Sequence, residues 1–163
     1  MRFGDYLSAV LLCGGAIAIS APSTARADDK ARLTGLSDVS FGLITASSDR
    51  SISQSVCAFS GSRTGGYSVV GVGSGQGGAF VLTGGPAPLP FDVLWASVAN
   101  TNGGTALAAN EAATGFVSST SQQSCNSGPS STASLTVVIR SSALNAARAG
   151  TYAGTLQITI APQ

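Results

Sequence analysis

Apolar and polar residues alternate over the last part of the chain, "AGTYAGTLQITIAPQ". Leu156, Ile158 and Ile160 share one parity with Tyr152 upstream, and the residues between the last three are polar. A period of two is typical of a β-strand with one buried and one exposed face. The pattern therefore predicts a half-buried strand that continues almost to the last residue, where most domains leave the chain loose.

Short apolar runs followed by turn-forming residues recur along the rest of the chain. Clusters such as "GSRTGG", "GSGQGG" and "NTNGG" separate these runs. Besides the terminal strand, they predict strands near residues 38–44, 52–60, 67–72, 79–83, 89–97, 114–120 and 133–141. Short strands at this spacing predict an all-β fold, an antiparallel β-sandwich.

Two stretches have some helical character. Residues 103–115 contain good helix formers but begin and end with glycine, so at most two helical turns are expected there. Residues 141–150 begin with Ser141 and Ser142, which are suitable N-terminal caps, and stop at Gly150. A single helical turn, or none, is expected to bridge two strands at this point.

The first 27 residues have the layout of a secretory signal peptide. A charged start precedes an apolar run at residues 6–19, and small residues then lead to Ala27, after which cleavage is expected. The run is too short to span a bilayer. A lipoprotein signal built on Cys13 is disfavoured, because Leu12 stands where that chemistry needs a small residue. Residues 28–163 are therefore expected to form one exported domain.

Charge and composition disfavour several classes of function. The whole chain has a formal net charge of +1, and loss of Arg2, Arg26 and Asp5 with the signal peptide leaves the mature chain neutral. A neutral surface gives no electrostatic footprint for nucleic acid or an anionic membrane. Hydrophobic residues make up 44% of the chain, in patterned runs, which argues against disorder.

Cys57 and Cys125 remain once the predicted signal peptide is removed. An even pair of cysteines in an exported chain is expected to form a disulfide. A loop of this length would give about 4 kcal/mol of stabilisation. Two buried free thiols are the alternative, and mass spectrometry with and without reductant distinguishes the two.

The sequence contains few residues that could act in catalysis or bind a metal ion. The sequence contains no histidine, which removes the usual general base, a common metal ligand and the Ser–His and Cys–His nucleophile pairs. The carboxylates Asp38, Asp49, Asp92 and Glu111 are far apart in sequence and form no recognisable acid–base pair or calcium loop. No catalytic, cofactor-binding or metal-binding residues are predicted, and the chain is not expected to be an enzyme.

Two further motifs have ordinary structural interpretations. Gly73, Gly75 and Gly78 match G-x-G-x-x-G, but that fingerprint needs a strand that turns into a helix, and another strand-like run follows here. The segment is expected to be a glycine-rich hairpin loop. Trp95 shares a strand face with Phe91, and such a stripe is expected in the core.

Several motifs, taken in order, resemble the spore coat protein U family. They are the signal peptide, "VSFG" at 39–42, Cys57, "GGYSV" at 65–69, "LPFDVLW" at 89–95 and the closing "AGTYAGTLQITIAPQ". The family includes pilin-like subunits of chaperone–usher pili, among them the Csu-like archaic class. The ending is the most specific motif, and the similarity covers most of residues 28–163, more loosely between 98 and 132.

The resemblance implies an immunoglobulin-like sandwich that lacks its last strand. In that family a periplasmic chaperone lends a strand to the exposed groove, and the amino-terminal extension of a neighbouring subunit later replaces it. The implied partners are that chaperone, an outer-membrane usher and other subunits of a homo- or heteropolymer, first in the periplasm and then at the cell surface. Tyr152, Leu156, Ile158 and Ile160 would line the groove.

The segment that could be donated to a neighbour is short. Arg32, Leu33, Gly35 and Leu36 form an arm ahead of the first expected strand, and this arm is the candidate donor. If it cannot donate, the chain would cap a fibre or act outside one.

The leading hypothesis is a structural subunit of a surface pilus or coat, assembled by donor-strand complementation. The alternative is a self-complete secreted binding module, an adhesin or carbohydrate-binding sandwich, with sites in the polar loops near Asn100, Asn102 and residues 122–126. A monomer that folds reversibly without a chaperone would favour the alternative. An enzyme that uses carboxylates alone ranks last.

Overall fold

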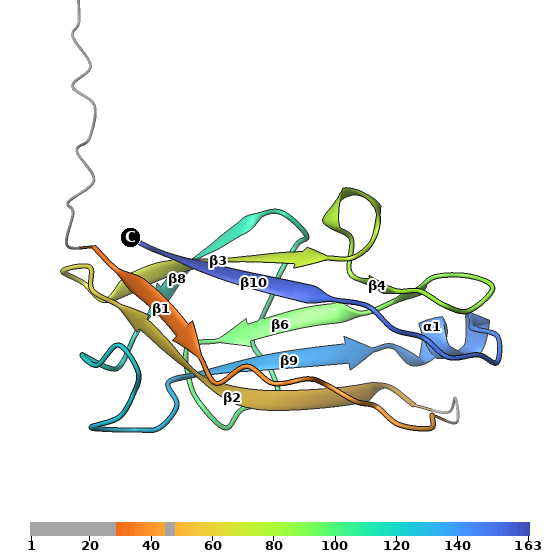
Figure 1. The fold of residues 1–163 in the computed structure, drawn as a ribbon, viewed down its shortest axis with the longest axis horizontal. Helices are drawn as coiled ribbons and strands as arrows, with labels where there is room; N and C mark the ends of the chain where they lie inside the picture. Colours follow the sequence, from red (N-terminus) through yellow and green to blue (C-terminus); the bar gives the residue numbers. More distant parts are fainter. Residues whose placement is uncertain (1–28, 45–47) are drawn as a thin grey trace, which may run out of the picture.

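The computed structural model describes residues 29–44 and 48–163 (Figure 1). The predicted signal peptide, residues 1–27, lies outside the described residues. The elements are, in chain order, β1 (Ala31–Thr34), β2 (Arg50–Ser60), β3 (Gly66–Gly73), the 3-10 turn η1 (Gln76–Gly78), β4 (Val81–Leu82), β5 (Leu89–Pro90), β6 (Asp92–Ala96), β7 (Thr105–Ala106), β8 (Ala112–Val117), β9 (Ala133–Ile139), α1 (Ser141–Ala146) and β10 (Leu156–Pro162).

The strands form two antiparallel sheets that pack as a sandwich, and the all-β prediction is confirmed. The larger sheet has the order β1–β2–β9–β6–β7, the smaller has the order β10–β3–β8, and β4 pairs separately with β5. Figure 1 shows β3 and β10 in one layer, above the layer that contains β2 and β9. The terminal strand β10 is therefore an edge strand, as is β1 on the other sheet.

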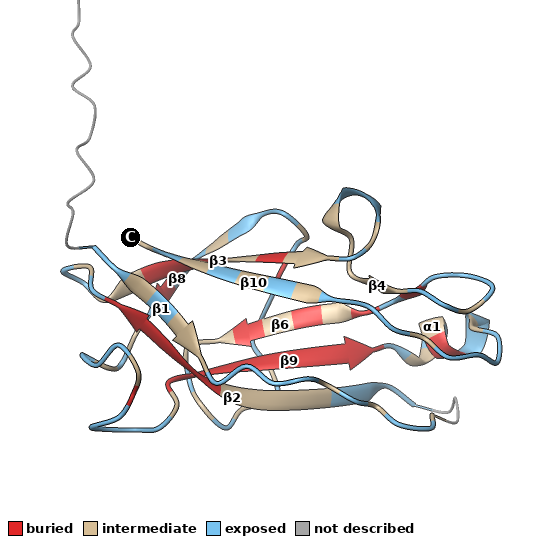
Figure 2. Ribbon diagram, viewed as in Figure 1, coloured by how far each residue is buried: buried red, intermediate tan, exposed pale blue. Residues whose placement is uncertain are grey.

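The strand β9 lies at the centre of the larger sheet, and Figure 2 shows it buried along its whole length. Its hydroxyl groups are satisfied within the protein. The Ser134 hydroxyl donates to the Val98 carbonyl oxygen at 2.9 Å, and the Thr136 hydroxyl donates to the Ser53 hydroxyl at 3.0 Å. Buried hydroxyls cost little once they are hydrogen-bonded, which is how a strand with two polar residues can lie at the centre of the sheet.

Trp95 and Tyr67 join the two sheets in the middle of the core. Trp95 on β6 is 0% exposed, and its indole Nε1–H donates to the hydroxyl of Tyr67 on β3 at 3.2 Å. Burial raises the pKa of Tyr67. Phe91 and Val93 are buried on the same face as Trp95, so the predicted core stripe is confirmed.

Cys57 and Cys125 form the predicted disulfide, with their Cα atoms 6.0 Å apart. Cys57 lies on β2 between Val56 and Ala58, which both belong to the core. Because side chains alternate along a strand, Cys57 faces away from that core. The disulfide therefore ties the loop between β8 and β9 to the outer side of the larger sheet.

Three local expectations were wrong. Residues 38–44 pair with no strand of the described chain, although a strand was expected there. Residues 103–115 contain β7 and the start of β8 in place of helical turns, because pairing with β6 and β3 overrides helix propensity. The glycine-rich segment after β3 is a 3-10 turn and no hairpin, since β3 and β4 belong to different sheets.

The helical turn expected after residue 140 is present as α1, but the predicted serine caps are not used. The N-cap position is Arg140, and no side chain caps the helix from there. The N–H of Ser141 instead donates to the Asp49 carboxylate at 2.8 Å. A residue distant in sequence thus does the work that a local hydroxyl was expected to do.

Candidate functional site: an apolar groove beside the terminal strand

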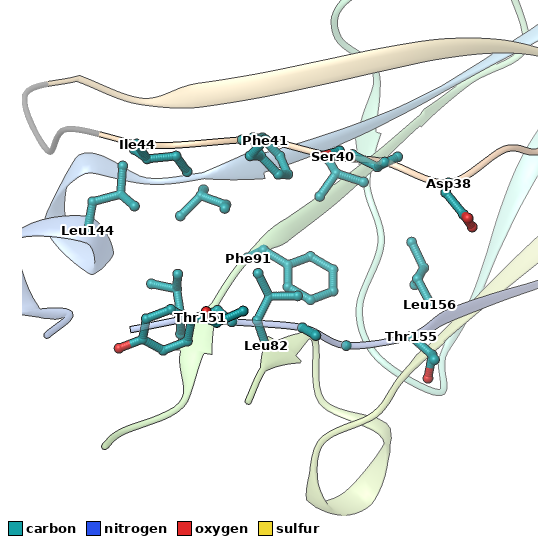
Figure 3. A pocket seen from close by; sticks show the side chains of 18 of the residues that line it. Asp38, Ser40, Phe41, Ile44, Leu82, Phe91, Leu144, Thr151, Thr155 and Leu156 are labelled. Atoms are coloured by element: carbon teal, nitrogen blue, oxygen red, sulfur yellow. The ribbon is translucent and has the colours of Figure 1, made fainter. Parts of the chain in front are cut away.

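A groove of about 1070 Å³ runs between β10 and residues 36–44. We call it the β10 groove and define it by residues 36–44 on one border, residues 147–156 with Ile158 on the other, and the floor between them. Figure 3 shows side chains of the two borders facing each other, Phe41 and Ile44 on one side and Leu156 on the other, with Phe91 between them.

The floor of the groove is apolar. Its buried residues come from β5, the residue between β5 and β6, β9 and α1, and they are Leu89, Phe91, Leu135, Val137, Ile139 and Leu144. The charged residues in the lining are Asp38 and Arg148, and both are exposed. The groove therefore suits apolar side chains, with charge confined to its rim.

One border of the groove is the free edge of β10. The ladder between β10 and β3 runs along the whole of β10 and occupies one side of the strand. On the other side β10 has no ladder partner in the described part of the chain, and the groove borders this free edge from Leu156 to Ile158. A free edge of this kind is a template for pairing. Leu156 and Ile158 are half-buried while Gln157 and Thr159 are exposed, so the predicted alternation places apolar side chains toward the floor.

The opposite border also lacks a strand partner. After β1 the chain passes through Gly35, whose φ is 87°. From there to Ile44 the backbone joins no ladder of the described chain, and the Ser37 N–H donates to the side-chain oxygen of Gln54 at 2.9 Å. Phe41 nevertheless packs against the core. This border is thus anchored by side chains while much of its backbone stays available for pairing.

Tyr152 lies at the end of the groove near α1, and a glycine makes room for it. A Cβ atom on Gly85 would lie 2.3 Å from the Tyr152 ring, which no side chain could accommodate. The Tyr152 hydroxyl donates to the carbonyl oxygen of Arg148 at 2.9 Å. These contacts hold the ring at its place in the lining.

The approach to β10 is fixed by a short bridge to the neighbouring segment. Thr83 and Ala153 exchange two backbone hydrogen bonds, of 2.7 and 2.8 Å. Next to this bridge, a Cβ atom on Gly154 would come within 2.9 Å of the carbonyl oxygen of Val81. Gly154 therefore permits the close approach between the chain ahead of β10 and β4, and this approach sets where the free edge of β10 begins.

An exposed ion cluster holds the start of α1, whose Leu144 contributes to the floor. Arg140 donates from Nε to Asp92 at 2.6 Å and from Nη1 to Asp49 at 3.0 Å. The backbone N–H of Ser141 and then the Arg140 guanidinium hold the pKa of Asp49 below its usual range. The two carboxylates, Asp92 first, raise the pKa of Arg140. No sequence signal had grouped these residues.

The structure brings most of the predicted groove residues together. Tyr152, Leu156 and Ile158 line the groove, whereas Ile160 lies further along β10, outside the lining. Sequence reasoning missed the opposite border at residues 36–44. The available signal is the shared parity of Val39 and Phe41, which by itself predicts only a strand near residues 38–44.

The candidate donor residues lie beside the groove in their own chain. Arg32 and Leu33 belong to β1, which pairs with β2. Gly35 follows β1, and Leu36, which is 43% exposed, begins the groove border.

The loops proposed for a self-complete binding module lie outside the lining of the β10 groove. Asn100 is engaged in the fold, since its N–H donates to the Ser55 hydroxyl and its side-chain oxygen accepts from that same hydroxyl. Asn102 is exposed, and residues 122–126 surround the disulfide at Cys125.

Within residues 29–44 and 48–163, no three histidine, cysteine, aspartate or glutamate side chains are grouped so as to hold a metal ion. The described part of the chain also has no helix of the length and apolar character needed to cross a membrane. A scan against protein-family models gives no match, and a search of curated proteins gives no significant match.

Proposed function

We propose that the chain is a structural subunit of a surface pilus or coat, and that the β10 groove accepts a β-strand from another chain. The observation that carries this proposal is the pairing capacity on both borders of one apolar groove. The free edge of β10 and the unpaired backbone of residues 36–44 face each other across a floor without charge.

A strand is the ligand that fits such a groove best. Its backbone would bond to β10 on one side and to residues 36–44 on the other, while alternate side chains would rest on the floor. The sandwich would then be an immunoglobulin-like fold that lacks one strand until a second chain supplies it. A small polar ligand would leave both backbone borders unsatisfied.

The remaining support comes from chemistry and resemblance. A disulfide between Cys57 and Cys125 suits an oxidising compartment. An open apolar groove with a free strand edge is an aggregation hazard, so a protein of this kind would need an escort before assembly. The spore coat protein U resemblance supplies the expected partners, which are a periplasmic chaperone, an outer-membrane usher and neighbouring subunits.

A matched pair of variants tests strand acceptance. The probe is a fluorescent peptide of about twelve residues, with Val or Leu at every second position and Thr, Lys or Glu between; we call it the alternating peptide. Ile158→Thr removes apolar surface from the groove and is expected to weaken peptide binding about tenfold. Thr159→Val changes the next residue on the outer face and should leave the affinity unchanged. Fluorescence anisotropy measures both.

Two outcomes would contradict the proposal. One is failure of the mature chain to bind the alternating peptide, and the other is equal weakening by Ile158→Thr and Thr159→Val. A second measurement compares periplasmic accumulation with and without a chaperone encoded beside the protein. A chain that accumulates in the periplasm without the chaperone, refolds reversibly and does not bind the alternating peptide would instead favour the self-complete binding module.

A further inference from the structure

The strand β1 lies across one end of the β10 groove. On β10 the groove reaches from Leu156 to Ile158, and Ile160 is no longer part of the lining. Figure 1 shows β1 beside the half of β10 that leads to the carboxyl end. Cα atoms of β1 lie within 8 Å of Cα atoms of β10, and β2 also approaches β10 within this distance.

This spacing leaves no room for another strand. Neighbouring strands lie about 4.8 Å apart, so a strand between β1 and β10 would hold them about 9.6 Å apart. Facing sheets pack about 10 Å apart. Since β1 is closer to β10 than either arrangement allows, a strand that enters the groove must stop short of the end of β10 while β1 stays in place.

Three features of β1 favour its displacement. It has four residues and is the edge strand of its sheet. Leu33 is its one large apolar side chain and is only partly buried. The chain leaves β1 through Gly35 at a φ of 87°, a conformation that costs glycine little and lets the backbone change direction.

We propose that β1 is a displaceable clasp, which closes the carboxyl end of the β10 groove in the isolated chain and leaves β10 when a donor strand pairs along its full length. This inference rests on the proposed function. Strand entry begins at the end of the groove away from β1, near Tyr152 and Leu144, and is completed by removal of β1. Because removal of β1 breaks its ladder with β2, the same step releases the candidate donor residues Arg32, Leu33 and Leu36, so a subunit accepts a strand before it offers one.

A cross-link that fastens β1 to β2 tests the clasp. The Gly61 N–H donates to the Lys30 carbonyl oxygen at 2.7 Å, so the next pair in the register, Ala31 and Ser60, is a non-hydrogen-bonded pair whose geometry suits a disulfide. The test variant is Ala31→Cys with Ser60→Cys. The control is Ala31→Ser with Ser60→Ala, which removes the same serine hydroxyl without a cross-link.

The mature wild-type chain and the control are expected to take up the alternating peptide at equal rates, and the cross-linked variant at least about tenfold more slowly. In the wild type, hydrogen exchange at the β1 amides should speed up once the peptide is bound. Equal uptake by the cross-linked variant and the control, or β1 amides as protected with peptide as without it, would overturn the clasp while strand acceptance stands. Failure of the peptide to bind any of the three proteins would overturn the proposed function and the clasp with it.

Discussion

Trp95 and Tyr67 show how single residues hold the two sheets together. They are 0% and 1% exposed, and the hydrogen bond between them satisfies two polar groups that water cannot reach. Their rings also meet nearly edge to face, with centroids 6.4 Å apart, an arrangement that aromatic pairs prefer. The pair lies on the core side of β6 and β3, so its loss would loosen the sandwich without touching the lining of the groove.

Replacement of Tyr67 by phenylalanine is expected to lower the free energy of unfolding by about 1–3 kcal/mol, because the indole N–H of Trp95 would be buried without a partner. Tyr152→Phe is the matched control, since it removes a hydroxyl that bonds to the Arg148 carbonyl oxygen from a more exposed position. It should cost less than about 1 kcal/mol. Urea denaturation measures both variants. Equal losses of unfolding free energy would show that the buried hydrogen bond contributes no more to stability than the exposed one.

The ion cluster around Asp49 predicts a pH dependence. Because the Ser141 N–H and Arg140 lower the pKa of Asp49 in the folded chain, its carboxylate stabilises the fold above the ordinary carboxyl range, and this contribution is lost as pH falls through the lowered pKa. Asp49→Asn keeps an acceptor for the Ser141 N–H but removes the charge. The variant is expected to be slightly less stable than the wild type at pH 7. The difference should stay constant down to about pH 4, shrink as pH falls further, and be absent only below the lowered pKa of Asp49.

Thermal denaturation between pH 2 and 7 measures this difference. The control is Glu111→Gln, at an exposed carboxylate that makes no ion pair within the described part of the chain. If the stability difference between Asp49→Asn and wild type does not shrink toward pH 2, the charge of Asp49 is not its cause.

At the scale of elements, the disulfide connects the loop between β8 and β9 to β2 across a sequence separation of 68 residues. A cross-link of this span restricts the unfolded chain strongly. Cys57→Ala with Cys125→Ala is therefore expected to lower the free energy of unfolding by about 4 kcal/mol. Alanine is chosen because both positions are buried. Wild type unfolded in reductant should match the variant, and a variant as stable as the oxidised wild type would contradict the prediction.

The elements that sequence patterns predicted well are those whose burial differs between alternate positions. The strand β10 and the face of β6 with Phe91, Val93 and Trp95 are of this kind. Residues 38–44 carry a similar pattern, but alternation reports only which side chains face the core. It does not report whether a neighbouring backbone is present to complete the ladder, and here it is not.

The candidate site was predictable on the β10 side and not on the other, for the same reason. Tyr152, Leu156 and Ile158 share a parity that sequence reveals. The contribution of residues 36–44 depends on how far that segment separates from β2. The ion cluster of Arg140, Asp49 and Asp92 depends on contacts between distant segments, for which a single sequence carries no signal.

At the scale of the whole molecule, the described part of the sandwich has a covered core and an open seam, which is the β10 groove. The floor residues of the β10 groove are buried by their neighbours, yet the groove above them remains large enough to take further apolar side chains. A strand that fills the seam would join the edge of the smaller sheet to residues 36–44. The chain with an empty groove and the chain with a strand bound in it are thus expected to differ in stability far more than in architecture.

A covalently attached strand tests this difference. The variant extends the chain beyond Gln163 with a flexible Gly/Ser linker of about fifteen residues, long enough to reach either end of β10, followed by the alternating sequence. Such a linker gives an effective concentration in the millimolar range. If the free peptide binds with a Kd near 1 μM, attachment should raise the free energy of unfolding by about 4 kcal/mol. The control carries serine at every apolar position of the added strand, and denaturant titration compares the two. Equal stability of the two extended chains would mean that the seam is not a place where a strand binds.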